Sequence, residues 1–373
     1  MNAEILGPEE ATRARRYQMK RLWLGLAASV VGFAVPAGFW IMAPGEWFRE
    51  AGGSLFWAGA MYFAVLVAVH HIAAFPLDYA SEFRLPRSVG LSNESLGGWL
   101  KDQGKSLVLN ILIGGAVAGA LAQIMAWRPY GWWWISAVLG TVFGIFMVLV
   151  TPVLIVPLFF RFKRITNSDL VERLENLLVR TGSRVRGGVW EMDMSRRTRA
   201  GNAALVGWGP SRRVVLGDTV LDYAPEEIEA ILAHEIAHHV GNHIWLLIAG
   251  RGVSLTAGLF LAHQLFRFPE VFMSLGAPVP IPGGPSSVGA LWIFMTIWGV
   301  ILAPFYRRIS RRLEFWCDRF AASHTGGAEA ISSALTRLCK NNLADPSPPA
   351  WAVTFFHTHP PLGERIRRVR ETS

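Results

Sequence analysis

Two histidines and a glutamate near the middle of the chain have the types and spacing of a catalytic metal site. Residues 233–242 read AHEIAHHVGN, so His234 and His238 are four residues apart and Glu235 follows the first. On a helix this spacing places both imidazoles on one face, one turn apart. In the H-E-x-x-H pattern two His bind Zn²⁺ and the Glu acts as general base toward water. Zinc can lower the pKa of water from about 16 to about 7.

The residues before the motif predict that it lies on a helix. The run 224–232, APEEIEAIL, puts Pro225 at the first position and acidic residues in the first turn. Both features are typical of a helix start. A pattern this short also arises by chance, and its two His would then be ordinary surface residues. The helical context favours the metal site.

A catalytic zinc ion takes three protein ligands and leaves one position for water, so a third ligand is needed. Residues 310–322, SRRLEFWCDRFAA, contain no Gly or Pro and predict a helix. Glu314 and Asp318 would share one face of it. Glu314 could bind the metal while Asp318 orients a ligand His from behind. The alternative is a solvated charged face, which the three arginines of this segment favour.

The composition indicates a membrane protein. The chain has 373 residues, of which 52% are hydrophobic and 16 are Trp, and its mean hydropathy is +0.32. An ordinary soluble protein of this length is less apolar. Runs of about 20 apolar residues can span a bilayer. Six such runs are predicted as spans: 22–43, 54–76, 107–127, 132–160, 244–266 and 288–305.

Charge gives these spans an orientation. The net charge is +9, and Lys and Arg gather beside the apolar runs, with no motif for binding DNA or RNA. We therefore expect no nucleic-acid partner. Cytoplasmic flanks are rich in Lys and Arg. The basic flanks are the leader, 83–105, 161–164 and 307–312, so both termini and the motif are expected in the cytoplasm. Two Cys make no disulfide framework and favour a reducing compartment.

These observations divide the chain into five parts. The leader is 1–21, and a bundle of four spans occupies 22–160 with a cytoplasmic loop at 77–106. The cytoplasmic peptidase part, 161–243, contains the motif helix. A membrane hairpin fills 244–306, and the third-ligand helix and catalytic tail fill 307–373.

Between the spans, the soluble part predicts a small α/β unit. Residues 168–181 have helical spacing of apolar side chains. Residues 187–194, 203–207 and 213–217 have the character of strands. An exposed edge strand would let an extended peptide pair through its main chain. The alternative for these strands is a plain structural hairpin.

Several segments together resemble the integral-membrane M48 peptidases, of the CAAX prenyl protease (Ste24-like) type. AHEIAHHVGNH is similar to the zinc helix of that family, and SRRLEFWCD to its S-R-x-x-E-x-x-A-D motif. Residues 201–203 and 213–219 resemble its N-A-x edge strand and V-V-L-x-D-T segment. The tail 357–366 resembles its H-P-x-L-x-E-R-I ending. The loop 79–105 and the run PVLIVPLFF at 152–160 resemble its membrane subgroup.

The resemblance implies a fold and a set of roles. The fold would be a mainly α-helical multispan membrane protein with a small, β-sheet-containing peptidase domain of the gluzincin type. Glu314 would be the third zinc ligand, and His359 would donate to the oxyanion, although a tail His can also cap a helix. Asn202 and Ala203 would bind the substrate backbone. Two departures are Cys317 in place of the usual Ala, and six predicted spans where the eukaryotic enzymes have seven.

The leading hypothesis is a membrane-embedded zinc metalloendopeptidase with one Zn²⁺ per chain. It would cleave peptide or protein substrates, possibly C-terminally prenylated ones, in contact with membrane lipid. One alternative is a membrane quality-control protease without prenyl specificity, and another is a non-enzymatic multispan protein with a structural metal. The expected location is a bacterial inner membrane rather than the ER membrane, with the active site facing the cytoplasm.

Overall fold

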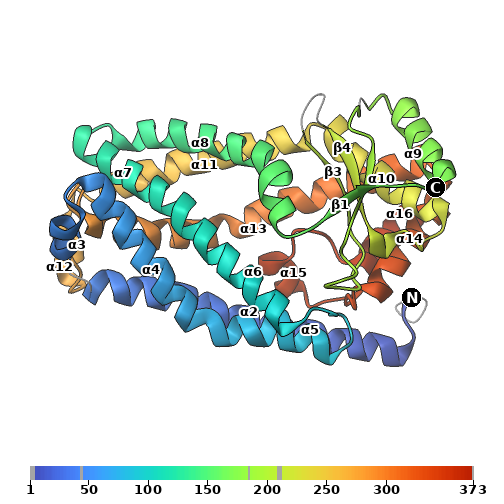
Figure 1. Ribbon diagram of the computed structural model, residues 1–373, viewed down its shortest axis with the longest axis horizontal. Coiled ribbons are helices and arrows are strands. Elements are labelled where there is room, and N and C mark those ends of the chain that lie inside the picture. The colour runs from blue at the N-terminus through green and yellow to red at the C-terminus, as the bar shows by residue number, and fades with distance from the viewer. Residues whose placement is uncertain (1–4, 43–44, 184, 208–211, 372–373) are drawn as a thin grey trace.

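A computed structural model describes residues 5–42, 45–183, 185–207 and 212–371. Its long helices follow one common direction, and a small sheet gathers at one end together with both termini (Figure 1). Six described segments are long and apolar enough to cross a membrane: Pro8–Met42, Leu55–Ser88, Leu96–Trp127, Trp132–Leu158, His243–Leu265 and Pro285–His324. The predicted fold class, a multispan helical protein with a small sheet, is confirmed.

The elements fall into a membrane part and a peptidase part. The helices of the membrane part are α2 (Pro8–Met42), α3 (Gly45–Gly52), α4 (Leu55–Asp78), α5 (Leu85–Ser88), α6 (Leu96–Leu109), α7 (Gly115–Trp127), α8 (Trp132–Val150), α11 (His243–Leu265), α12 (Pro269–Ser274) and α13 (Pro285–His324). The peptidase part adds α9 (Ser168–Arg180), α10 (Pro225–Val240), α14 (Gly327–Asn341), α15 (Ala350–Phe356) and α16 (Leu362–Glu371). Serines at 54 and 95 cap α4 and α6 through their hydroxyl oxygens.

The charged flanks of the spans are mostly helical, which corrects the predicted loop at 77–106. After α4 the chain continues through a π-helical stretch, Tyr79–Arg84, into α5, and α6 begins at Leu96. Hydropathy marks only the part of a helix that suits an apolar medium, whereas its hydrogen bonds continue into water. For the same reason α2 includes most of the predicted leader, and α13 runs unbroken from the sixth span through the predicted third-ligand helix.

Four short strands form the sheet, in the order β1-β2-β4-β3. They are β1 (Phe162–Arg164), β2 (Val189–Met192), β3 (Ala203–Val206) and β4 (Arg213–Gly217). β2 and β4 are parallel, and the two outer strands are antiparallel to their neighbours. The three predicted strands are confirmed, and β3 is an edge strand. β1 was not predicted, because a three-residue basic strand has the same composition as a membrane flank.

The core of the peptidase part includes the beginning of the chain. Apolar side chains of α9, β4, α10, α14 and α16 form one buried cluster, and Ile5, Leu6 and Ala14 belong to it. Burial of an apolar side chain stabilises a fold by about 1.5–3 kcal/mol. The first turns of α2 are therefore a structural piece of the peptidase part.

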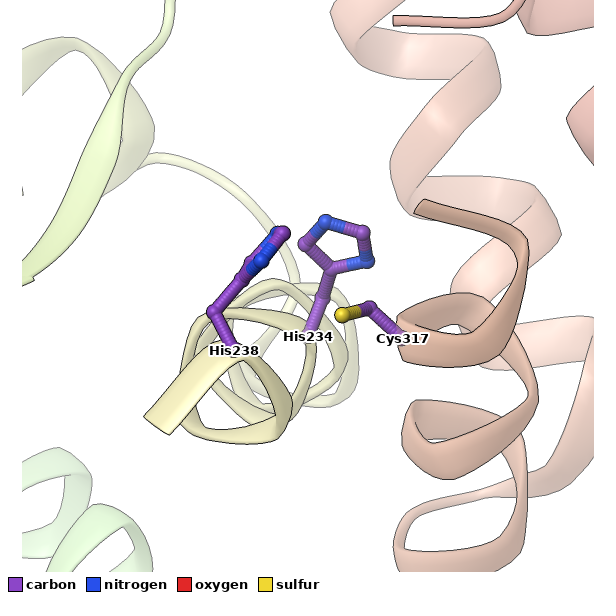
Figure 2. Close-up of side chains that lie close together, drawn as sticks. All are labelled: His234, His238 and Cys317. Carbon is purple, nitrogen blue, oxygen red and sulfur yellow. The ribbon is translucent and has the colours of Figure 1, made fainter. Parts of the chain in front are cut away.

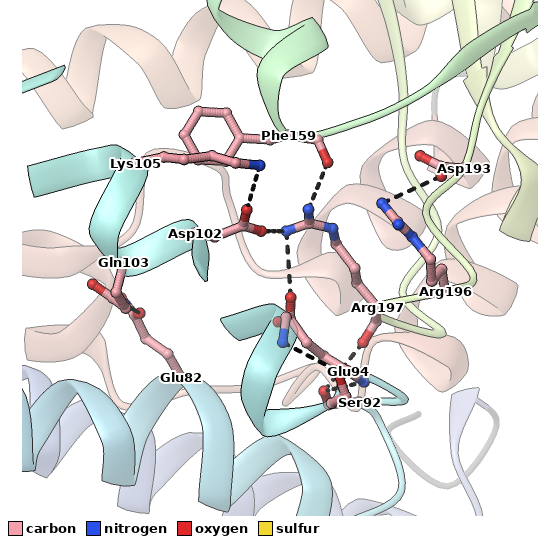
Figure 3. Close-up of polar contacts among 12 residues, drawn as sticks. Glu82, Ser92, Glu94, Asp102, Gln103, Lys105, Phe159, Asp193, Arg196 and Arg197 are labelled. Carbon is pink, nitrogen blue, oxygen red and sulfur yellow. Dashed lines mark hydrogen bonds and ion pairs between the residues drawn. The ribbon is translucent and has the colours of Figure 1, made fainter. Parts of the chain in front are cut away.

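A polar cluster ties the loop before β3 to the membrane helices (Figure 3). Arg197 of that loop forms an ion pair with Asp102 of α6 and lies 3.3 Å from Glu94 Oε1. It also donates a hydrogen bond of 2.5 Å to the Phe159 carbonyl, at the end of the fourth span. Lys105 pairs with Asp102 at 2.9 Å. These contacts fix the edge strand relative to the bundle.

Candidate metal centre and active site

Helix α10 carries the H-E-x-x-H motif and is buried along most of its length. Pro225 occupies its first position, and the Glu227 carboxylate accepts a hydrogen bond of 3.0 Å from the Ala224 backbone N–H. The apolar side chains of Ile228, Leu232 and Ile236 pack into the core. This packing turns the other face of α10, with His234 and His238, toward α13.

Three side chains from α10 and α13 converge on one point. Glu314 Oε2 lies 3.3 Å from His234 Nε2, and Glu314 Oε1 lies 3.3 Å from His238 Nε2. The His234 and Glu314 side chains are only 8% and 2% exposed. The structure thus brings together the three residues that the sequence suggested as metal ligands, although they come from segments on either side of a membrane hairpin.

The donor set fits a zinc ion. Bonds of about 2.0–2.1 Å in a tetrahedron place neighbouring N and O donors about 3.3 Å apart. Each Glu314 oxygen lies at this separation from one of the two Nε2 atoms. Glu314 Oε2 is also buried and, within the described part of the chain, accepts no well-directed hydrogen bond. His359 Nδ1 is 2.8 Å away but does not satisfy it in a hydrogen-bonding direction. A buried oxygen beside two imidazoles that accepts no hydrogen bond from the described residues fits the role of a cation ligand.

Cys317 is a second candidate for the third metal ligand, with a thiol in place of a carboxylate. Figure 2 shows its sulfur extending from α13 toward the two imidazoles of α10. His234, His238 and Cys317 offer ligand atoms within 4.8 Å of one another, so this group could hold a metal. However, Cys317 Sγ contacts His243 Nδ1 at 3.6 Å, and that nitrogen is 3.2 Å from His238 Nδ1. Cys317 is therefore linked through His243 to Nδ1 of His238, whereas Glu314 lies next to Nε2.

Asp318 and Arg365 lie behind His234. Asp318 Oδ1 is 2.9 Å from His234 Nδ1, which fixes the ring so that Nε2 faces Glu314. Arg365 donates to both oxygens of Asp318, at 2.6 and 2.8 Å. In the metal-free site, burial lowers the pKa of His234, but the adjacent carboxylates of Asp318 and Glu314 have a larger, opposite effect and raise that pKa to about 9.

A cavity of about 760 Å³ opens over the motif. Its lining includes Glu235, the tail residue His359, and Asn202 and Ala203 at the start of β3. Burial raises the pKa of Glu235, despite the opposing effect of the nearby imidazoles. The structure thus places the site residues suggested by the sequence at the convergence point or on this cavity, except Asp318, which lies behind His234.

Two further His of the motif region serve the scaffold. His239 Nε2 lies 3.0 Å from the Leu205 carbonyl and links α10 to β3. His243 is buried against His238 and stacks edge-on against Trp316. Sequence reasoning missed Arg365, whose only signal was its position in the tail motif.

A second cavity, of about 780 Å³, lies among the membrane helices. Its walls are mainly apolar, and its lining includes Phe63, Val117, Ile155 and Trp292, with Asn110 among its few polar members. These residues come from four of the six candidate spans.

Comparisons with known proteins agree with this geometry. The model of peptidase family M48 matches residues 164–373. A second model, described as the CAAX prenyl protease N-terminal part with five membrane helices, matches residues 2–161. The described residues of that part hold four candidate spans, one fewer than this description.

Individual proteins resemble the chain over most of its length. An uncharacterised metalloprotease, YhfN of Bacillus subtilis, is 26% identical over 87% of this chain and 76% of its own. CAAX prenyl protease 1 of Saccharomyces cerevisiae is 26% identical over 82% of this chain and 70% of its own. The crystal structure of Ste24p from S. mikatae has the same fold, with a TM-score of 0.87 at 23% identity, and covers 98% of this chain and 90% of that one. The chain therefore belongs to peptidase family M48 and is a membrane-embedded metalloprotease with a CAAX prenyl protease type N-terminal part.

Proposed function

We propose that the protein is a zinc metalloendopeptidase in which His234, His238 and Glu314 hold one Zn²⁺ per chain. The observation that carries the proposal is the pair of 3.3 Å separations that join the Glu314 carboxylate to the two Nε2 atoms. When bound, zinc supplies Lewis-acid polarisation of a carbonyl and a water of lowered pKa. Cys317 is a neighbour of the centre in this proposal, since its sulfur contacts His243, which lies against Nδ1 of His238.

The residues around the centre then have separate tasks. Glu235 accepts a proton from the attacking water and passes it to the leaving amine as the peptide bond breaks. Its raised pKa suits a base that must work near neutral pH. Asp318 holds His234 in the ligating orientation. Asn202 and Ala203 bind the substrate main chain along β3, and His359 donates to the oxyanion once substrate separates it from Glu314.

The substrate is proposed to be a peptide with an apolar attachment or segment, as in the CAAX prenyl proteases that the chain resembles. The apolar cavity among the spans supports this assignment, because its walls offer burial to a lipid-like group. A membrane quality-control protease without prenyl specificity is the second candidate, and the match to a Bacillus protein favours it, since prenylated substrates are not expected in bacteria. Membership of a peptidase family sets aside the non-enzymatic hypothesis.

The proposed location is a bacterial inner membrane with the active site toward the cytoplasm. Lys163 and Arg164 belong to β1, Arg161 directly precedes that strand, and the arginines at 307–312 stand just before Glu314 on α13. The opposite turns carry few Lys or Arg. This distribution follows the positive-inside rule. Both cysteines are free and buried, which suits a reducing compartment.

The test compares Glu235→Gln with the wild-type protein in detergent. Substrates are a farnesylated CAAX peptide, its unprenylated twin and casein, each with and without a chelator. We expect Glu235→Gln to keep its zinc and to lose at least about 100-fold in activity, in line with the contribution of a general base. Glu226→Gln, an exposed change on the same helix, is the matched control. Full activity of Glu235→Gln would disprove the mechanism, and equal cleavage of all three substrates would leave only the quality-control candidate.

A further inference from the structure

One wall of the active-site cavity has no task in the mechanism above. Besides β3 and the tail, the cavity is lined by one face of α2, with Arg15, Gln18 and Arg21 nearest the peptidase part and Leu22, Gly25 and Ser29 further along the helix. Sequence reasoning treated these arginines as charges that orient a span. The structure instead places them across the same cavity as Glu235 and Asn202.

This wall is held in place firmly. Ile5 and Leu6, just before α2, and Ala14, in its second turn, are buried in the peptidase core. Gln18 Nε2 donates a hydrogen bond of 2.9 Å to the Leu343 carbonyl, which follows α14. A peptide bound along β3 would therefore meet the arginines of α2 at a fixed distance, rather than on a loose terminal arm.

Among the described residues, the two guanidinium groups have no carboxylate partner of their own. Within residues 5–42, 45–183, 185–207 and 212–371, no Asp or Glu oxygen forms an ion pair with Arg15 or Arg21. Asp345 also lines the cavity, but its carboxylate accepts the Ser347 backbone N–H at 2.9 Å. Arg365, the third arginine that lines this cavity, already donates hydrogen bonds to both oxygens of Asp318. The α2 wall thus presents two uncompensated positive charges to whatever enters.

We propose that Arg15 and Arg21 form an anion-binding subsite that selects peptide substrates bearing a carboxylate near the scissile bond. The carboxylate is either the C-terminus of the peptide or an acidic side chain. Guanidinium groups suit this task, because their planar N–H groups can donate two parallel hydrogen bonds to a carboxylate. This inference rests on the proposed peptidase function and names a specificity determinant for it.

The experiment measures binding and cleavage separately. The double variant Arg15→Gln/Arg21→Gln is compared with Arg16→Gln/Lys20→Gln, which removes two charges from the same helix at residues that line a different pocket. Three versions of one fluorescent peptide are used: a free C-terminal carboxylate, a C-terminal amide, and the amide with an added internal Glu. Binding is measured by anisotropy in the Glu235→Gln background, and cleavage as KM and kcat in the active background.

We expect wild-type protein to bind a carboxylate peptide about tenfold more tightly than the neutral amide, a size typical of charge-assisted hydrogen bonds at a partly exposed site. The arginine double variant should lose this preference through KM with kcat unchanged, and the control pair should keep it. Whichever of the two carboxylate peptides shows the preference identifies its source. The variant Arg15→Lys/Arg21→Lys should retain part of it.

Three results would overturn the inference. Equal binding of the carboxylate and amide peptides by the wild-type protein refutes it even if the variants do not fold. An equal loss of preference in the control pair assigns the effect to general charge. Dependence on anionic lipid, measured in nanodiscs of neutral and acidic lipid with one peptide, would assign the arginines to lipid headgroups. The proposed function fails separately, if no peptide is cleaved in a Glu235-dependent manner.

Discussion

Replacing Asp318 by Asn separates the two tasks that its carboxylate performs. The side chain is 1% exposed, and its oxygens contact His234 on one side and Arg365 on the other. Toward His234 it fixes the ring orientation that metal binding needs. Toward Arg365 it neutralises a guanidinium that is itself only 7% exposed. An Asn has nearly the same shape but no charge, so the variant weakens both contacts without opening a cavity.

The expected sizes differ for the two contacts. Loss of a carboxylate behind a metal-ligating His costs about 10–100-fold in metal affinity or activity, which corresponds to about 1.4–2.7 kcal/mol. Leaving a buried charge without its partner costs about 3–5 kcal/mol of folding stability. The Asn oxygen can still accept one hydrogen bond from Arg365, so the stability loss should lie toward the lower end of that range.

A double-mutant cycle with Arg365→Met checks this partition. Met removes the unpaired charge and fills a similar volume, so Asp318→Asn/Arg365→Met should recover stability, measured as the thermal midpoint of the metal-free protein in detergent. It should not recover zinc affinity, measured by competition with a chromophoric chelator. Zinc affinity within threefold of wild type in Asp318→Asn, or its return in the double variant, would refute the orienting role.

Two further predictions concern the centre itself. Glu314→Gln should lose bound zinc on dialysis while Cys317→Ala keeps it, because the Glu314 carboxylate has an oxygen 3.3 Å from each Nε2 atom. A sulfur-to-metal charge-transfer band in the cobalt-substituted wild-type protein would contradict this assignment. Zinc affinity should fall about tenfold for each pH unit between pH 8 and pH 5. The reason is that His234, with a pKa of about 9 without metal, must release a proton when zinc binds. Zinc affinity that stays equal at every pH, measured against a fixed chelator, would show that no such proton is displaced.

Local periodicity was enough to single out the candidate metal ligands. His234 and His238, and likewise Glu314 and Asp318, are neighbours on one helix face at a separation of four residues, and such spacing can be read without knowledge of the fold. That the two helices meet could not be derived from spacing, because a membrane hairpin separates them. It came from the resemblance of their motifs to one family, and the structure brings them together.

The contacts that sequence reasoning missed are long-range or lie in charged segments. Arg365 pairs with a carboxylate 47 residues away, and nothing in the composition of the tail indicates that partner. Arg15 and Arg21 stand in a basic segment beside a span, where the positive-inside rule already accounts for charge. β1 was missed for the same reason, because its basic residues are also explained as a membrane flank. When membrane topology already explains a basic segment, its composition does not indicate that the same residues also line a cavity or form a strand.

The helix ends explain why the centre forms where it does. α10 is followed at once by α11, a candidate span, and the turn between them depends on Asn242 in the left-handed conformation, with φ of 53°. α13 leaves the membrane as the same unbroken helix that carries Glu314 and Asp318. The two halves of the metal site are therefore continuations of the two helices of one membrane hairpin. Because ligand separations near 3.3 Å tolerate little displacement, we expect packing within the membrane to set the geometry of this candidate metal site. A peptidase part without its hairpin would retain the motifs but lose the constraint that brings their donors together.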